Sequence, residues 1–248
     1  MKNKWIRRII LLVCAVCLLV SSTEVAKILY GYIKTDKVND SIVSQYVESV
    51  SSEETPSDEP QPVVKEPAIT VNFDSLLSRN SEVIGWLYCP DSVINYPVVK
   101  GEDNEKYLHA DLDGDYLKGG TLFADYRTAN IGEGNTVIYG HSMKNGSMFG
   151  MLLRYKKQSY FEENPVMYFL TPDCTYKLEL VYGRVIDDED SIYNPNTDAY
   201  GYIKENISSS TFKSGVEIDE DDTFITLSTC SYESDDSRFI VIGKLSVN

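Results

Sequence analysis

The chain has 248 residues, of which 42% are hydrophobic, and a formal net charge of −15 at pH 7. This apolar content argues for a packed globular unit rather than a disordered chain. An acidic body of this size repels phosphate backbones, so nucleic acid is not an expected partner.

Residues 1–25 are predicted to be a membrane anchor with a short basic cytoplasmic flank. Basic residues precede an uninterrupted apolar run from Ile9 to Val20. This run is short for a membrane-spanning helix and typical of a signal-peptide core. However, no small-residue cleavage site follows it, and its neighbours on both sides extend the apolar stretch. We therefore expect an uncleaved single-pass anchor that holds the rest of the chain outside the cell, with a removed signal peptide as the alternative.

Residues 26–70 are predicted to join the anchor to the folded domain. Within residues 26–50 the apolar positions have the spacing of a broken amphipathic helix. Residues 51–67 are rich in Ser, Glu and Pro and have almost nothing to bury, which is typical of a linker.

The folded domain is expected to cover residues 71–248. It begins with a short helix for which Asn72 or Asp74 is the predicted N-cap. From Trp86 onward, short β-type runs alternate with turn residues, a pattern that indicates an all-β barrel or sandwich. Helical insertions are predicted at 147–155 and within 198–212. The β-type runs are 86–89, 93–99, 121–126, 135–140, 166–170, 176–186, 223–229 and 238–245.

The chain has five cysteines, which do not form a disulfide scaffold. Cys14 and Cys17 lie in the apolar N-terminal run, so Cys89, Cys174 and Cys230 remain for the domain. This odd number leaves at least one thiol unpaired. We expect Cys89 and Cys174 to be free and half-buried, with a disulfide between them as the alternative.

Three residues at strand ends have the chemistry for cysteine acyl transfer. His141 follows the run 135–140, Cys230 ends another run, and Arg238 opens the next one, so Cys230 and Arg238 should face each other across a hairpin. A thiolate is a nucleophile, an imidazole can protonate a leaving amine, and a guanidinium can bind an oxyanion. Alone, each residue also fits a plain structural role: a half-buried thiol, a turn histidine and a surface arginine.

The local sequence around these residues favours the catalytic interpretation. T-L-S-T-C at 226–230, followed by Arg238, resembles the active-site signature of sortases. The blocks 84–87, 94–99, 120–125 and 135–141 resemble class B sortases and occur in the same order. The resemblance runs from about residue 72 to 248.

The resemblance implies a mostly β fold, a closed eight-stranded sortase-type β-barrel with N-terminal helices and a helical insertion before the catalytic strand. It also implies that Cys230 is the nucleophile, His141 the general acid/base, and Arg238 the clamp for oxyanion and substrate. Ser228 and Thr229 would line the substrate groove, and Asn104 is a further candidate for substrate binding. At Ser231 some relatives carry Glu, so a substrate contact by an acid there is not expected.

The activity that the resemblance implies is transpeptidation. The enzyme would cleave a C-terminal sorting signal of the N-P-x-T-x kind after Thr, form a thioester, and pass the protein to an amine of peptidoglycan or its lipid-linked precursor. The partners would be surface proteins that bear this signal. The host would be a Gram-positive bacterium, with the catalytic domain outside a single membrane span.

No cofactor or metal is expected. The acidic loop 111–115 lacks the Gly and Glu that an EF-hand needs at its sixth and twelfth positions. His109 has no Cys or second His near it in the sequence and is predicted to be structural. The acidic runs 187–190 and 217–222 are predicted to be solvated loops.

Two other classes of protein remain as alternatives. Cysteine hydrolases of the papain-like or cell-wall-peptidase type carry the Cys early, at a helix N-terminus, and the His later, whereas the order here is the opposite. A surface-anchored binding module with an incidental Cys230 is the second alternative. Replacing Cys230 separates it from an enzyme, because a binding module would keep its function.

Overall fold

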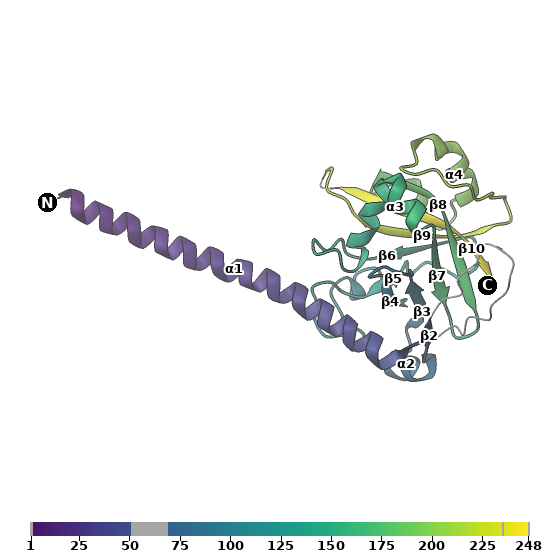
Figure 1. Cartoon of the computed structure of the whole chain (residues 1–248), viewed down its shortest axis with the longest axis horizontal. Coiled ribbons are helices and arrows are strands. Elements are labelled where there is room, and N and C mark those ends of the chain that lie inside the picture. The colour runs from purple at the N-terminus through teal and green to yellow at the C-terminus, as the bar shows by residue number, and fades with distance from the viewer. Residues whose placement is uncertain (1, 51–68, 235, 248) are drawn as a thin grey trace, which may run out of the picture.

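The computed structural model describes residues 2–50, 69–234 and 236–247, so the predicted linker at 51–67 lies outside the described residues. A single helix, α1 (Lys2–Tyr46), occupies the N-terminal part (Figure 1). The prediction of a broken helix within 26–50 was therefore wrong. Gly31 is the only glycine in α1 and proline is absent from it, and an isolated glycine lowers helix stability without ending the helix.

The C-terminal turns of α1 are part of the domain. Ile42 and Tyr46 are each 3% exposed and pack in one cluster with Leu76. Directly after the helix, β1 (Val47–Ser49) pairs antiparallel with β2 (Ile69–Val71), a two-stranded sheet that the sequence did not predict.

The short helix predicted after β2 is α2 (Phe73–Arg79). Of the two candidate caps, Asn72 is the N-cap, and its side chain accepts a hydrogen bond from the backbone N–H of Ser75 at 3.0 Å.

The barrel is closed, with the strand order β10-β8-β7-β3-β4-β5-β6-β9. The pairs β4–β5 and β6–β9 are parallel, and the other pairs are antiparallel. Each predicted β-type run forms one strand, so the closed eight-stranded barrel implied by the resemblance is confirmed. The strands are β3 (Val83–Tyr88), β4 (Asn95–Val99), β5 (Leu122–Ala124), β6 (Asn135–Tyr139), β7 (Val166–Leu170), β8 (Thr175–Asp187), β9 (Thr223–Cys230) and β10 (Ser237–Val247).

The connections hold short helices on the outside of the barrel. The predicted helical segment 147–155 is a 3₁₀ helix, η2 (Phe149–Lys156), and a second helix that the sequence did not predict, α3 (Gln158–Glu163), follows it. The insertion before β9 contains α4, as predicted within 198–212. The other helices are η1 (Lys106–Leu108), η3 (Ser191–Tyr193), α4 (Ala199–Asn206) and η4 (Ile207–Ser209).

The barrel interior is filled with large apolar side chains, which fix the strands that carry the site. Leu87, Phe169, Ile225 and Phe239, from four different strands, are all fully buried in one cluster. The five cysteines are all free, as expected, although Cys89 is fully buried rather than half-buried.

Candidate active site

Cys230 and Arg238 are register partners across the β9–β10 hairpin. β9 ends at Cys230, and the chain returns within a few residues to start β10 at Ser237. The backbone N–H of Ser231 donates to the carbonyl of Ser237 at 2.9 Å, which closes the base of the connecting loop. The hairpin prediction is therefore confirmed, and the side chains of Cys230 and Arg238 lie at the same end of the barrel.

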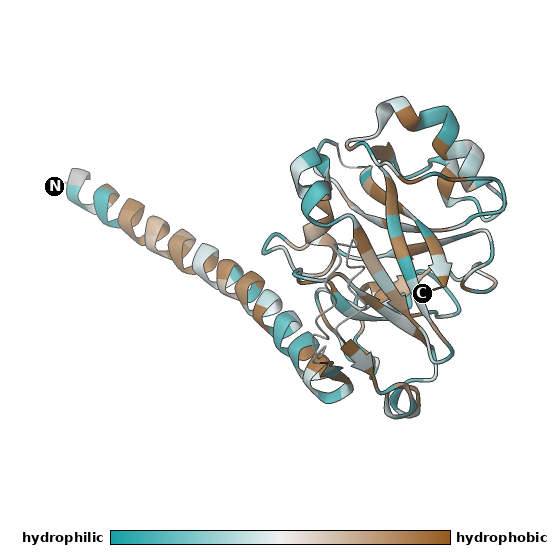
Figure 2. Cartoon of the chain, turned by 45° about the vertical axis from the view of Figure 1, so that its right-hand side comes forward, coloured by the Kyte–Doolittle hydropathy of each residue, from teal (hydrophilic) through white to brown (hydrophobic). Residues whose placement is uncertain are grey.

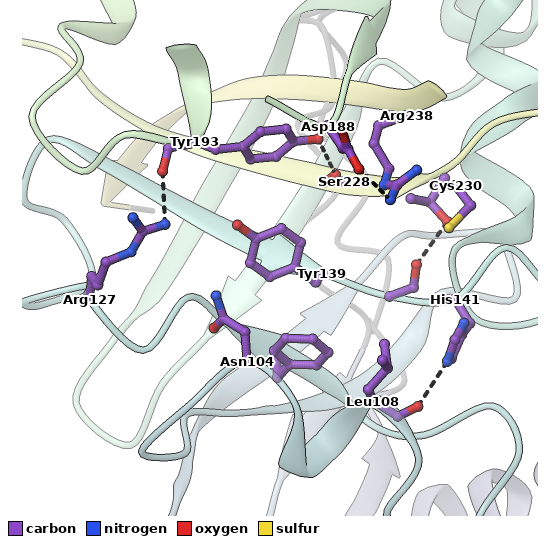
Figure 3. A pocket seen from close by; sticks show the side chains of 13 residues that line it. Asn104, Leu108, Arg127, Tyr139, His141, Asp188, Tyr193, Ser228, Cys230 and Arg238 are labelled. Carbon is purple, nitrogen blue, oxygen red and sulfur yellow. Dashed lines mark hydrogen bonds and ion pairs between the residues drawn. The ribbon is translucent and has the colours of Figure 1, made fainter. Parts of the chain in front are cut away.

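His141 reaches the same end through the parallel pair β6–β9. Tyr139 is the register partner of Ser228, so two residues further along each chain His141 and Cys230 reach the same end of the sheet. The Thr229 hydroxyl donates to the carbonyl of Gly140 at 2.8 Å and ties the two exits together. In Figure 3, Cys230 lies between Arg238 above it and His141 below it.

Gly140 is required at this crossing. A Cβ atom on it would collide with the side chains of Leu122 and Phe149, both fully buried. The Y-G-H sequence is thus explained by packing, because only glycine lets β6 pass close to the core immediately before His141.

The carbonyl of Leu108 fixes the ring of His141. It lies 2.8 Å from Nε2 of His141, and since a carbonyl only accepts hydrogen bonds, Nε2 carries the proton. The other ring nitrogen, Nδ1, is then the atom that exchanges protons. Burial lowers the pKa of His141; the Leu108 contact opposes this shift, and the neighbouring His109 adds to it.

His109 lies against His141, which sequence reasoning did not foresee. The two imidazoles are stacked, with 5.1 Å between ring centroids and 21° between planes. Both segments come from loops, and His109 follows η1, whose last residue is Leu108. Only the packing of these loops brings the two histidines together.

Asp188 holds the guanidinium of Arg238. Its Oδ2 atom lies 3.3 Å from Nη2 of Arg238, and Nη1 of Arg238 donates to the carbonyl of Ser237 at 3.2 Å. Asp188 belongs to the acidic run that we predicted to be a solvated loop. It is exposed, but it also lines the groove, a role that its sequence context did not indicate.

A groove of about 470 Å³ joins these residues. It extends from Cys230 and His141 to Tyr193 of η3, whose hydroxyl is 2.7 Å from the hydroxyl of Ser228 (Figure 3). The groove is lined by Asn104, Leu108, Phe123, Arg127, Tyr139, Gly140, His141, Asp188, Tyr193, Ser228, Thr229, Cys230 and Arg238.

The three predicted substrate-binding residues all line this groove, and all of them have partners within the protein. Ser228 bonds to Tyr193 and Thr229 to Gly140, as described above, and both residues are buried. The Asn104 side chain donates to Oδ2 of Asp125 at 3.1 Å and accepts from the backbone N–H of Tyr126 at 3.0 Å.

Asp125 accepts hydrogen bonds from three residues that line the groove, Asn104, Arg127 and Tyr139. Its burial would raise its pKa, but hydrogen bonds from Arg127, Asn104 and Tyr139 outweigh burial and lower the pKa to about 2. Asp125 is therefore ionised at neutral pH and holds Asn104 in one orientation. Arg127 also donates to the backbone carbonyl of Tyr193 at 3.0 Å, which joins two residues that line the groove.

The residue after the nucleophile, Ser231, belongs to a charged cluster. The Lys156 ammonium donates to the Ser231 hydroxyl at 2.8 Å and to Glu233 at 2.5 Å. Glu233, two residues after Ser231, is thus paired with a lysine. Among the residues that the structure describes, no group of three or more His, Cys, Asp or Glu side chains is arranged to hold a metal ion.

Comparison with known proteins assigns this arrangement to a family. A family model for the sortase domain matches residues 87–246. Sortase B of Listeria monocytogenes is 33% identical over 177 residues, which are 68% of this chain and 72% of the relative. The chain belongs to the sortase family and is of class B.

Solved structures agree with the assignment of this class B sortase. Sortase B of Bacillus anthracis in complex with AAEK1 superposes with a TM-score of 0.71 at 28% identity, over 89% of this chain and all of that one. The substrate complex of Staphylococcus aureus sortase B gives a TM-score of 0.66 at 28% identity, over 71% of this chain and 84% of that one. This sortase is therefore a cysteine transpeptidase.

Proposed function

We propose that this sortase cleaves a C-terminal sorting signal of the N-P-x-T-x kind after Thr and transfers the protein to an amine of peptidoglycan or its lipid-linked precursor. The Cys230 sulfur attacks the Thr carbonyl carbon, the peptide C–N bond breaks, and the leaving amine takes a proton. The acceptor amine then attacks the thioester, and Cys230 regains its proton as the thiolate leaves.

Each role has a geometric support. The register pairing of Arg238 with Cys230 is the observation that carries the proposal, because it brings the two residues to the same end of the barrel, where the guanidinium would bind the oxyanion. His141 has its Nε2 proton committed to Leu108, so Nδ1 delivers a proton to the leaving amine and later takes one from the acceptor. The exposure of Cys230 allows both substrates to reach the sulfur.

The groove supplies the signal-binding site in this proposal. Ser228, Thr229 and Asn104 would contact the peptide through backbone groups and the faces of their side chains, since their polar atoms already have partners. The groove has room for a short extended peptide and is lined by Leu108, Phe123 and Tyr139 as well as by polar groups.

We also propose that the enzyme stays in the cell membrane through residues 1–25, that residues 26–70 connect it to the catalytic domain, and that residues 71–248 carry the activity outside the cell. α1 contains a stretch long and apolar enough to cross a membrane, with a mean hydropathy of 2.4. The basic residues before it favour a cytoplasmic N-terminus.

A fluorescence-quenched N-P-x-T-x peptide tests the assignment with the full-length chain in detergent. Cys230→Ala should abolish cleavage, while Cys174→Ala, at a half-buried cysteine away from the groove, should leave it intact. Equal loss in both variants would indicate a folding defect and refute the nucleophile assignment. Adding a peptidoglycan peptide with a free amine should convert the hydrolysis product into a ligated product by mass spectrometry, and its absence would contradict the transfer step.

A further inference from the structure

α1 connects the anchor to the catalytic domain without a break, which fixes the height of the domain above the membrane. The hydrocarbon core of a bilayer is about 30 Å thick and takes about 20 helical residues. Counted from Ile9, directly after the basic flank, these residues reach Ile28. Figure 2 shows this half of α1 as largely apolar, and its large hydrophobic side chains are exposed in the described structure.

The polar groups in the outer part of this stretch are satisfied within the helix. Ser22 and Thr23 donate to the carbonyls of Leu19 and Val20 at 2.9 and 2.7 Å. Glu24 and Lys27 form an ion pair of 2.7 Å. These contacts lower the cost of placing the polar groups in or near the hydrocarbon.

The domain meets α1 immediately beyond this point. Lys118 packs against Gly31, and its ammonium lies 4.6 Å from the ring centroid of Tyr32. The Lys34 ammonium donates to the backbone carbonyl of Tyr116 at 2.7 Å. The three helical residues from Ile28 to Gly31 span about 4.5 Å and the six to Lys34 about 9 Å, while the headgroup layer is about 5–7 Å thick, so this contact extends from within the headgroup layer to its outer edge.

The side chains at this contact suit a lipid interface. Tyr116 is 69% exposed, although it belongs to the folded domain, and Tyr30 on the facing helix is 67% exposed. Tyrosine and lysine are the residues that settle at headgroup level, with an apolar body toward the lipid and a polar end in water.

We propose that the turn segment 116–118, together with Tyr30 and Lys34, rests on the headgroups of the outer leaflet, so that the catalytic groove opens beside the lipid surface. This inference rests on the uncleaved anchor of the proposed function. The same turn is hydrogen-bonded to the residue that stacks on His141: the backbone N–H of Leu117 donates to the carbonyl of His109 at 3.0 Å. In Figure 1, α1 leaves the barrel on the side where β9 and β10 are joined, and the C-terminus lies on the other side.

Tryptophan quenching by brominated lipids tests this contact in full-length protein in liposomes. The substitution Trp5→Phe removes one of the two native tryptophans. The other, Trp86, is fully buried and gives a constant signal. Tyr116→Trp should be quenched at least about twofold more than Val247→Trp, a matched position that is 71% exposed near the C-terminus. Equal quenching of the two would overturn the proposal.

An insertion variant tests the headgroup contact separately from the membrane anchor. About eleven helix-forming residues placed between Leu29 and Tyr30 add about three turns, lift the domain by about 16 Å and keep its orientation. Quenching of Tyr116→Trp should fall to the level of Val247→Trp, while peptide cleavage in detergent stays unchanged. Unchanged quenching of Tyr116→Trp in the insertion variant would overturn the proposed headgroup contact. Loss of the protein from washed liposomes would instead refute the uncleaved anchor, and with it this inference.

Discussion

The imidazole of His109 lies stacked on the imidazole of His141, whose Nε2 proton is held by the Leu108 carbonyl. A second ionisable ring in contact with the proposed general acid/base affects when that group can carry a proton. Both burial and His109 act to lower the pKa of His141. His109 is thus a candidate for tuning the site although it has no role in the chemistry itself.

We predict that His109→Gln moves the limb of the pH profile of kcat/KM that reports the titration of His141 toward higher pH. Replacing the neighbouring imidazole by a neutral amide removes a group that lowers the pKa of His141, so this pKa rises. The profile is measured with the quenched peptide from pH 5 to 9. A limb that stays in place, or moves to lower pH, would show that His109 does not influence His141.

Arg238→Lys is expected to lower kcat by about 10²–10³, although the charge is kept. A guanidinium presents several donors in a planar fork, and losing one oxyanion donor costs about 2.7–4 kcal/mol in the transition state. The melting temperature should change little, because the ion pair with Asp188 is partly exposed and weak. Arg154→Lys, at an exposed arginine outside the groove, serves as the control. Near-normal turnover in Arg238→Lys would mean that charge alone suffices.

Tyr46→Ala should destabilise the protein by about 3 kcal/mol, whereas Tyr30→Ala should have almost no effect in detergent. Both tyrosines are on α1, but Tyr46 is 3% exposed and packed in the domain, and Tyr30 is 67% exposed. Thermal unfolding of the two full-length variants measures the difference. Equal melting temperatures would contradict this prediction and show that the packing of Tyr46 does not stabilise the domain.

The strands were predictable because each is a short apolar run bounded by turn residues, a signal contained in neighbouring residues. The β9–β10 hairpin, and with it the meeting of Cys230 and Arg238, follows from the same local signal. The β1–β2 pair was missed because β1 has only three residues and directly follows a long helix. The unbroken course of α1 was missed because its second half takes support from Lys118 and other residues distant in sequence.

The approach of His141 to Cys230 was not contained in local sequence. It depends on a parallel pair whose residues Gly140 and Thr229 are 89 positions apart, and only the family resemblance suggested it. His109 and Asp188 were missed for a related reason. Each lies in a loop whose position is set by the packing of other segments, which leaves no periodic pattern in the sequence.

The closed barrel also limits how a peptide can be recognised. Every barrel strand has a hydrogen-bonded neighbour on both sides over at least part of its length, because β6 pairs with β9 and completes the circle. A peptide substrate therefore meets few unpaired strand edges in the described barrel, and β-augmentation is not a general source of affinity. Selectivity must come from the shape and the side chains of the groove, so exchanging loops between sortases should change the preferred motif without rebuilding the barrel.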